Sequence, residues 1–125
     1  MDLIIGGAYQ GKLEYARKKY SLSVDDIFTC SENKKVDFGK RCIYNIENYT
    51  LWCVTNNIDA IAFFKEHKDE WQSSILICED IFCGVVPIEK EMRAWREMTG
   101  KLCAYLSCEA EHVVRMFCGL EQKLK

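Results

Sequence analysis

The sequence has little of what marks disordered, membrane-spanning or nucleic-acid-binding proteins. A single proline among 125 residues, with no repeat or low-complexity tract, leaves no candidate linker, and we expect one domain over residues 1–125. Seventeen Lys and Arg against nineteen Asp and Glu give a net charge of −2, which offers no bulk attraction to nucleic acid or anionic membranes. The first residues contain neither a basic segment nor a long apolar run. We therefore expect a cytoplasmic globular protein without nucleic-acid or membrane partners.

Cysteine, by contrast, is abundant, with eight thiols that could form disulfides, bind a metal or serve as small buried apolar side chains. Disulfides are the least expected of the three, because a reducing cytosol keeps thiols free. Cys78 and Cys83, and Cys103 and Cys108, lie at the outer limit of zinc-ligand spacing. The second pair falls in a predicted helix, where five residues rotate a side chain by about 140°. We expect buried, unligated thiols and no zinc, with a metal or redox site as the alternative.

Hydrophobic patterning predicts strands that alternate with helices. The predicted strands cover residues 2–5, 27–30, 42–46, 73–78 and 112–117, and the predicted helices cover 11–20, 59–70 and 88–109, with a possible bend at Gly100. Residues 31–41 are predicted to form a loop, and residues 119–125 a frayed tail. This alternation is typical of an α/β fold with a mainly parallel sheet. Ligands bind such sheets at the carboxyl ends of the strands, so the loop after residues 2–5 is the first candidate site.

That loop, GGAYQGK at residues 6–12, fits the phosphate-binding pattern G-x-x-x-x-G-K between a predicted strand and a predicted helix. Glycines let backbone amides surround an anion, the helix N-terminus adds partial positive charge, and Lys12 can reach the β and γ phosphates. A plain glycine turn is the alternative explanation. The predicted nucleotide-binding residues are Gly6, Gly7, Ala8, Tyr9, Gln10, Gly11, Lys12 and Leu13, with Lys12 as the catalytic candidate.

Leu13 departs from this pattern. A serine or threonine normally follows the lysine, and its hydroxyl coordinates the magnesium ion that bridges the phosphates. Leucine offers no such ligand. The loop is therefore expected to bind phosphate through its amides and Lys12, but to hold magnesium weakly.

Three segments resemble one family. The loop at 6–12, EDIFCGVVP at 79–87 and MRAWREMTGKLCAYLSCEAEHVVRMFCGL at 92–120 are similar to the bifunctional adenosylcobinamide kinase/adenosylcobinamide-phosphate guanylyltransferases of cobalamin biosynthesis. That family carries GGARSGKS, a motif resembling NEVGxGIVP, and a C-terminal region that runs roughly RxFRDxxGxxNQ. The segments cover about two-fifths of the chain, in the family's order and spacing.

The resemblance implies a P-loop NTPase-like, three-layer α/β fold with a central, mostly parallel sheet flanked by helices. It implies phosphorylation of adenosylcobinamide by ATP or GTP with magnesium, then GMP transfer from GTP through a histidine, in a homotrimer. The segment IYNIENYTLW at 43–52 resembles the family's VLLDCLTLW and places Glu47 at its magnesium-organising aspartate. Asp80 is a second carboxylate suited to that cation. The alternatives are a solvated acid at a strand end for Glu47 and a turn residue for Asp80.

Other departures bear on the second activity. The family carries its guanylylated histidine after the second strand, whereas this chain has no histidine before His67 and is shorter in that region. His67 and His112 are expected to be structural or solvated. Cys103 and Ala104 replace the family's asparagine and glutamine after the glycine of the long helix. We therefore expect that guanylyl transfer by the family's route is lost.

Two hypotheses follow. In the first, the chain is a nucleotide-binding protein of this family that retains at most kinase or nucleotide-hydrolysing activity, with a corrinoid as its possible acceptor. In the second, it is a catalytically inactive member that serves as a regulatory or oligomeric interaction subunit. The sequence does not distinguish ATP from GTP.

Overall fold

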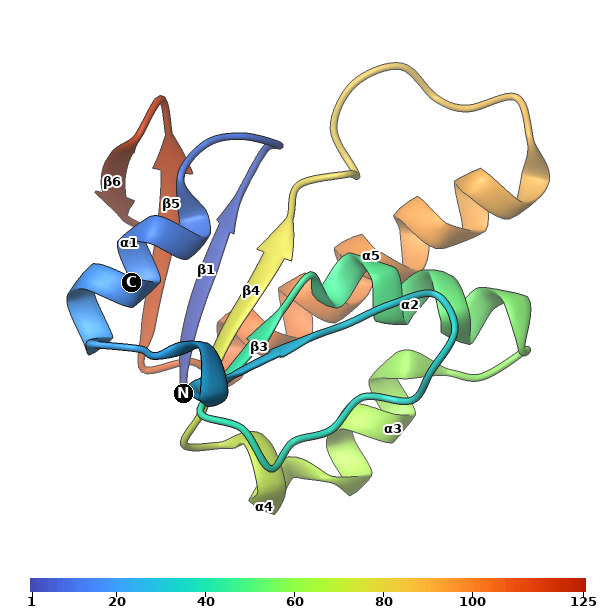
Figure 1. Cartoon of the computed structure of the whole chain (residues 1–125). Helices are drawn as coiled ribbons and strands as arrows, with labels where there is room; N and C mark the ends of the chain where they lie inside the picture. Colours follow the sequence, from blue (N-terminus) through green and yellow to red (C-terminus); the bar gives the residue numbers. More distant parts are fainter.

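The computed structural model describes all residues, 1–125, and has one six-stranded sheet as its centre (Figure 1). The strand order is β2-β3-β4-β1-β5-β6, and every pair is parallel except β5 with β6. The strands are β1 (Asp2–Gly6), β2 (Ile27–Thr29), β3 (Cys42–Tyr44), β4 (Ile75–Glu79), β5 (His112–Phe117) and β6 (Leu120–Lys123). The helices are α1 (Lys12–Tyr20), α2 (Ile46–Thr55), α3 (Ala60–Glu66), α4 (Lys68–Trp71) and α5 (Lys90–Glu109), with a 3₁₀ turn at Val24–Asp26.

Helices cover both faces of the sheet, so the fold has three layers. Alternate residues of each strand face opposite sides: Leu3 and Leu76 pack in the cluster with α2, α3 and α5, whereas Ile4 and Ile77 pack against Ala16 of α1. These four strand residues and Ala16 are all fully buried. This architecture confirms the predicted α/β, P-loop NTPase-like class.

Most of the predicted elements are confirmed within two residues of their bounds. The predicted helix over 59–70 begins after Asp59, whose carboxylate accepts from the amides of Ile61 and Ala62, and it divides into α3 and α4 at His67. Helix α5 runs unbroken through Gly100. No helix is long and apolar enough to cross a membrane.

Two predictions are wrong. Asn45 and Ile46 were predicted to continue the strand that starts at Cys42, but the strand ends at Tyr44, Asn45 adopts a left-handed conformation (φ 60°), and Ile46 begins α2, a helix that was not predicted. The tail at 119–125 was predicted to fray, but Leu120–Lys123 forms β6. Cys118 and Gly119 both have positive φ, which closes a tight hairpin and returns the chain antiparallel to β5.

Candidate nucleotide-binding site

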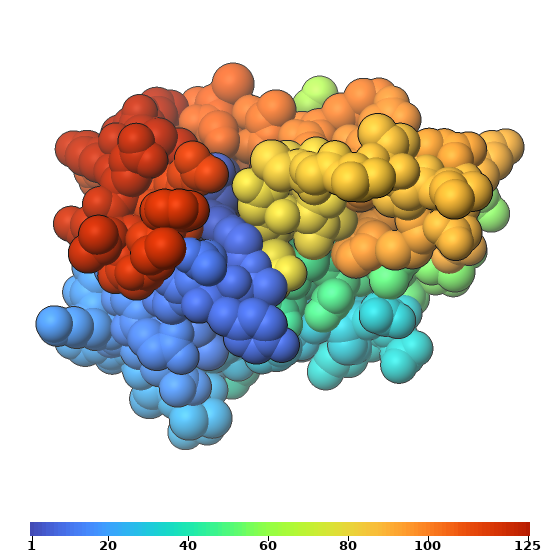
Figure 2. Space-filling view, turned by 90° about the horizontal axis from the view of Figure 1, so that it is seen from above, coloured from blue at the N-terminus to red at the C-terminus, as the bar shows by residue number.

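The carboxyl ends of β1 and β4 lie side by side, at the position where open α/β sheets have their ligand crevice. These strands pair in parallel with Gly6 opposite Glu79, and the helices that follow them, α1 and α5, lie on opposite faces of the sheet. In open α/β sheets, ligands bind where neighbouring strands send their connections to opposite sides. Figure 2 looks onto this edge: the dark blue segment with the glycine loop lies between the red C-terminal hairpin and the yellow segment around residue 80.

The predicted phosphate loop lies at this edge of the sheet, directly after β1. Tyr9 (φ 57°) and Gly11 (φ 83°) are left-handed, and no side chain caps α1, so the amides of its first turn have no side-chain acceptor. Residues 7–11 form the turn between β1 and α1, so the motif lies between a strand and a helix as predicted. Tyr9 is fully exposed at the tip. The loop geometry suits an anion, because partial positive charge gathers at the start of α1.

Lys12, the first residue of α1, lies back across this loop. Its side chain is only 5% exposed, its Nζ donates a hydrogen bond of 2.6 Å to the carbonyl oxygen of Gly7, and Glu79 Oε2 lies 3.9 Å away. A buried ammonium group needs such partners, because burial of a charge without them costs several kcal/mol. The lysine is thus held at the loop, with one carboxylate from the neighbouring strand beside it.

Glu47 lies behind Glu79. It is 5% exposed in the first turn of α2, and its Oε2 accepts a 2.8 Å hydrogen bond from the amide of Glu79. Its carbonyl oxygen accepts from the indole nitrogen of Trp95 on α5 at 2.7 Å. Burial raises the pKa of the Glu47 carboxyl above its usual value, although the Glu79 amide acts in the opposite direction. The alternative of a solvated acid at a strand end is wrong for Glu47.

Asp80 follows Glu79 at the same edge. Its amide donates to the carbonyl oxygen of Gly6 at 2.9 Å, which ties the end of β4 to the start of the loop. Its Oδ2 accepts from the Cys83 thiol at 3.4 Å, whereas its Oδ1 is buried without a hydrogen-bond partner. No three of the His, Cys, Asp and Glu side chains converge into a ready metal cluster. The predicted metal residues Glu47 and Asp80 therefore both lie at the crevice, on either side of Glu79.

Glu79 is the residue that sequence reasoning missed. It ends the buried strand β4, directly beside the strand that precedes the loop, and it contacts Lys12 and, through its amide, Glu47. The sequence does contain a signal for this residue, because an acid at position 79 directly follows the apolar run ILIC of the predicted strand. Leu13, in contrast, is half-buried and packs against the cluster on the α1 face, and so offers no oxygen to the crevice.

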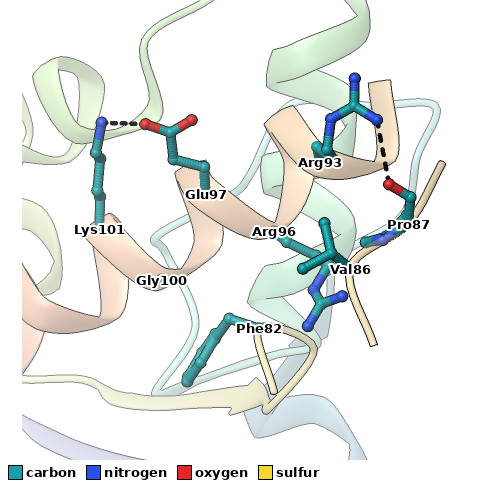
Figure 3. Close-up of a pocket in the computed structure, with 8 residues that line it drawn as sticks. All are labelled: Phe82, Val86, Pro87, Arg93, Arg96, Glu97, Gly100 and Lys101. Carbon is teal, nitrogen blue, oxygen red and sulfur yellow. Dashed lines mark hydrogen bonds and ion pairs between the residues drawn. The ribbon is translucent and has the colours of Figure 1, made fainter. Parts of the chain in front are cut away.

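Beyond β4, the segment from Cys83 to Glu89 forms a loop supported by two arginines of α5. Arg93 donates to the carbonyl oxygens of Pro87 (3.2 Å) and Ile88, and Arg96 to those of Gly84 (3.2 Å) and Val85. A hollow of about 410 Å³ lies between this loop and α5. Figure 3 shows the side chains that line it. Its lining combines Phe82, Val86 and Pro87 with Arg93, Arg96, Glu97, Gly100 and Lys101. Val85 and Ile88 project into solvent at about nine-tenths exposure.

The two histidines lie elsewhere. His112 begins β5 opposite Asp2, at the amino edge of the sheet, and its Nδ1 lies 2.9 Å from Asp2 Oδ1. His67 stacks on Phe63, with ring centroids 4.1 Å apart, and its Nδ1 bonds the carbonyl oxygen of the same residue. Neither ring reaches the crevice, in agreement with the structural roles expected for both.

The cysteine pairs do not converge. Cys78 is fully buried on β4 while Cys83 is exposed on the loop, and Cys103 is buried on α5 while Cys108 is exposed near its end. Cys78 contacts Cys103, and this neighbour, together with burial, raises the pKa of the Cys78 thiol. All eight thiols are free.

Comparison with known families identifies the chain. A family model described as cobinamide kinase / cobinamide phosphate guanyltransferase matches residues 42–124, about two thirds of the chain. The chain belongs to this family. Membership of this family makes the chain a P-loop protein with a cobinamide kinase/guanylyltransferase-like role in cobalamin biosynthesis. The matched range includes Glu47, Glu79, Asp80 and both arginines, and it begins after the glycine loop. Among curated proteins, none matches the chain.

Proposed function

We propose that the chain is a kinase that transfers the γ-phosphoryl group of a nucleoside triphosphate to the hydroxyl of a corrinoid alcohol, adenosylcobinamide, and that it lacks the family's guanylyl transfer. The observation that carries this proposal is the position of Lys12, held at the loop by Gly7 and beside Glu79 on the neighbouring strand. In this reaction the alcohol oxygen bonds to the γ-phosphorus and its proton passes to solvent, while the bond from the γ-phosphorus to the bridging oxygen breaks and a nucleoside diphosphate leaves with that oxygen.

The loop residues hold the phosphates in this proposal. Amides of residues 7–13 and the Lys12 ammonium neutralise the phosphate oxygens as the bridging bond breaks. The hollow beside Phe82 and Val86 offers apolar surface for a bulky acceptor, next to the Asp80 end of the crevice. Arg93 and Arg96 fix the shape of that surface through the loop carbonyl oxygens.

The residues at the crevice fit a magnesium ion. Carboxylate oxygens are the ligands that this cation prefers, and Asp80 Oδ1 is a buried oxygen without a partner. Glu47 and Asp80 would hold the ion, directly or through water, and when bound it would offset charge on the transferred phosphoryl group. Leu13 supplies none of the usual hydroxyl ligation, so we propose weak magnesium binding.

The absence of a histidine at the crevice supports the loss of guanylyl transfer. His112 lies at the opposite edge of the sheet, and His67 packs on Phe63 among the helices of one face. A nucleophile must approach its target to about 3 Å, so neither ring can attack a nucleotide in the loop without refolding.

Nucleotide binding tests the first step. Calorimetric titration with ATP and with GTP, each with and without magnesium, should give saturable binding that falls at least tenfold in Lys12→Ala, because charge-assisted contacts to phosphate contribute about 1.5–3 kcal/mol each. Lys90→Ala, an exposed lysine on α5, is the matched control and should bind as the wild type does. Equal affinities for wild type and Lys12→Ala would refute the proposal.

Leu13 also favours a second candidate, an inactive subunit that regulates or assembles with other chains. Substitution Leu13→Ser supplies the missing hydroxyl. The kinase proposal predicts that it increases the effect of magnesium on nucleotide affinity and turnover, whereas an inactive subunit would remain inert. The homotrimer implied by the family resemblance is part of either candidate, and light scattering on the purified chain would test it.

A further inference from the structure

A groove beside the glycine loop has no role in the transfer step described above. It lies between α1 and the β5–β6 hairpin and has a volume of about 600 Å³. We propose that this groove binds the nucleobase of the triphosphate, and that Glu121 selects guanine. This assignment rests on the proposed function, since it concerns the nucleotide whose phosphates the loop would hold.

The hairpin lies directly against the glycine loop. The amide of Cys118, in the turn, donates a 2.5 Å hydrogen bond to Gln10 Oε1. A Cβ built on Gly11 would lie 3.8 Å from Gly119 Cα, so the two backbones approach closely at the start of α1. Figure 2 shows the red hairpin against the blue loop segment. A nucleotide with its phosphates in the loop therefore has the groove next to its sugar.

The groove combines apolar surface with a polar edge. Its lining consists of Tyr15, Lys18, Lys19, Gly119, Leu120 and Glu121. Leu120 is 72% exposed, and the half-buried Tyr15 ring lies along α1. A planar base needs apolar contact for its faces and a few placed polar groups for its edge, which is what this lining supplies. The opposite rim carries Lys18 and Lys19, whose positive charge suits a polyanionic ligand.

Glu121 faces α1 from the edge strand. It pairs in register with Met116, whose side chain packs in the α1 cluster, and it lines the groove beside Tyr15, where burial and the Glu121 carboxylate raise the pKa of the tyrosine hydroxyl. An ionised carboxylate only accepts hydrogen bonds. Guanine presents two adjacent donors, the ring N1–H and the 2-amino group, which match the two carboxylate oxygens. Adenine presents only its 6-amino group, and xanthine replaces the 2-amino group with an acceptor oxygen.

A change of base preference tests the assignment. Dissociation constants for GTP, ATP and XTP should be measured for the wild type, for Glu121→Gln and for the control Glu66→Gln, an exposed acid on α3. We expect the wild type to prefer GTP over ATP, and Glu121→Gln to lower GTP affinity by about tenfold while it raises XTP affinity. The glutamine amide can donate to the 2-oxygen of xanthine, so a purely structural role of Glu121 would not produce that gain. Glu66→Gln should leave all three constants unchanged.

Inorganic tripolyphosphate separates this assignment from the function it rests on. Its affinity should fall in Lys12→Ala and remain unchanged in Glu121→Gln. If binding depends on Lys12 while the base preference of Glu121→Gln equals that of the wild type, the groove assignment is wrong and the phosphate site stands. If neither nucleotides nor tripolyphosphate bind the wild type, both proposals are wrong.

Discussion

The buried carboxylate of Glu47 gives the sharpest test of how the crevice is built. Two variants separate its charge from its hydrogen bond. Glu47→Gln keeps an oxygen that can accept from the Glu79 amide, whereas Glu47→Ala leaves that amide without its acceptor. The difference between these variants reports the hydrogen bond together with the packing that alanine also removes, and the difference between Glu47→Gln and the wild type reports the charge.

The structure sets the expected magnitudes. Loss of the acceptor leaves a part-buried amide unpaired, which costs about 1–3 kcal/mol, so Glu47→Ala should be destabilised by at least that amount. The negative charge of Glu47 lowers the stability of the wild type, because burial raises the pKa of this carboxyl above its ordinary value of 4.5. Glu47→Gln should therefore be as stable as the wild type at neutral pH, or more stable, while nucleotide affinity in magnesium falls.

The sign of the pH dependence follows from linkage. A carboxyl whose folded-state pKa exceeds its unfolded value lowers stability when both states are ionised, and this penalty disappears as pH falls through the folded-state pKa towards 4.5. Urea unfolding from pH 7 to pH 4 should show the wild type gaining stability relative to Glu47→Gln on acidification. If Glu47→Gln is instead as unstable as Glu47→Ala at pH 7, the buried charge is a net stabiliser and the reasoning fails.

Three packing predictions can be checked by the same unfolding assay. Gly6→Ala would place a Cβ 2.6 Å from the carbonyl oxygen of Met116, so β1 and β5 must separate, at a cost of about 1–3 kcal/mol; unchanged stability would contradict the close strand contact. The hydroxyls of Thr50 and Thr99 bond at 2.6 Å between α2 and α5, so each single valine variant should lose about 1 kcal/mol, and the double variant less than the sum; strict additivity would argue against the bond. Gly100→Ala should stabilise α5 by about 1 kcal/mol, because the nearest atom to the added Cβ is 3.6 Å away; a loss of stability would indicate tighter packing there.

Hydrophobic patterning predicts the parallel sheet and most of its helices because those elements bury continuous or periodic apolar faces. It fails at α2, where Tyr49, Thr50, Trp52 and Val54 favour a strand by local propensity. The helix forms because packing against α5 outweighs that preference, and Asn45 allows the left-handed turn that starts it.

The second failure, at β6, has a different cause. Residues 120–123 are all exposed, so no hydrophobic pattern marks them as a strand. The hairpin depends on the left-handed pair Cys118 and Gly119 and on backbone pairing with β5, and cysteine is not a typical residue for such a turn.

The turn between β1 and α1 was predictable because its glycines encode a local conformation, whereas the meeting of the acidic residues at one edge of the sheet was predictable only in part. Glu47 and Asp80 lie 33 positions apart in the chain, and only the parallel register of β3, β4 and β1 brings them to one edge. Glu79 lies between them for the same reason. The spacing of residues in the sequence does not show which strands are neighbours in the sheet. Glu79 was therefore missed, although it lies next to Asp80.

Product analysis tests the central proposal most directly. The purified chain should be incubated with adenosylcobinamide, magnesium and GTP labelled at the γ-phosphate, with Lys12→Ala in parallel, and the corrinoid analysed by mass spectrometry and label transfer. We predict a corrinoid that carries one labelled phosphate and no GMP, with the product lost in Lys12→Ala. An unmodified corrinoid would contradict the kinase proposal, and a corrinoid that carries GMP would contradict the loss of guanylyl transfer.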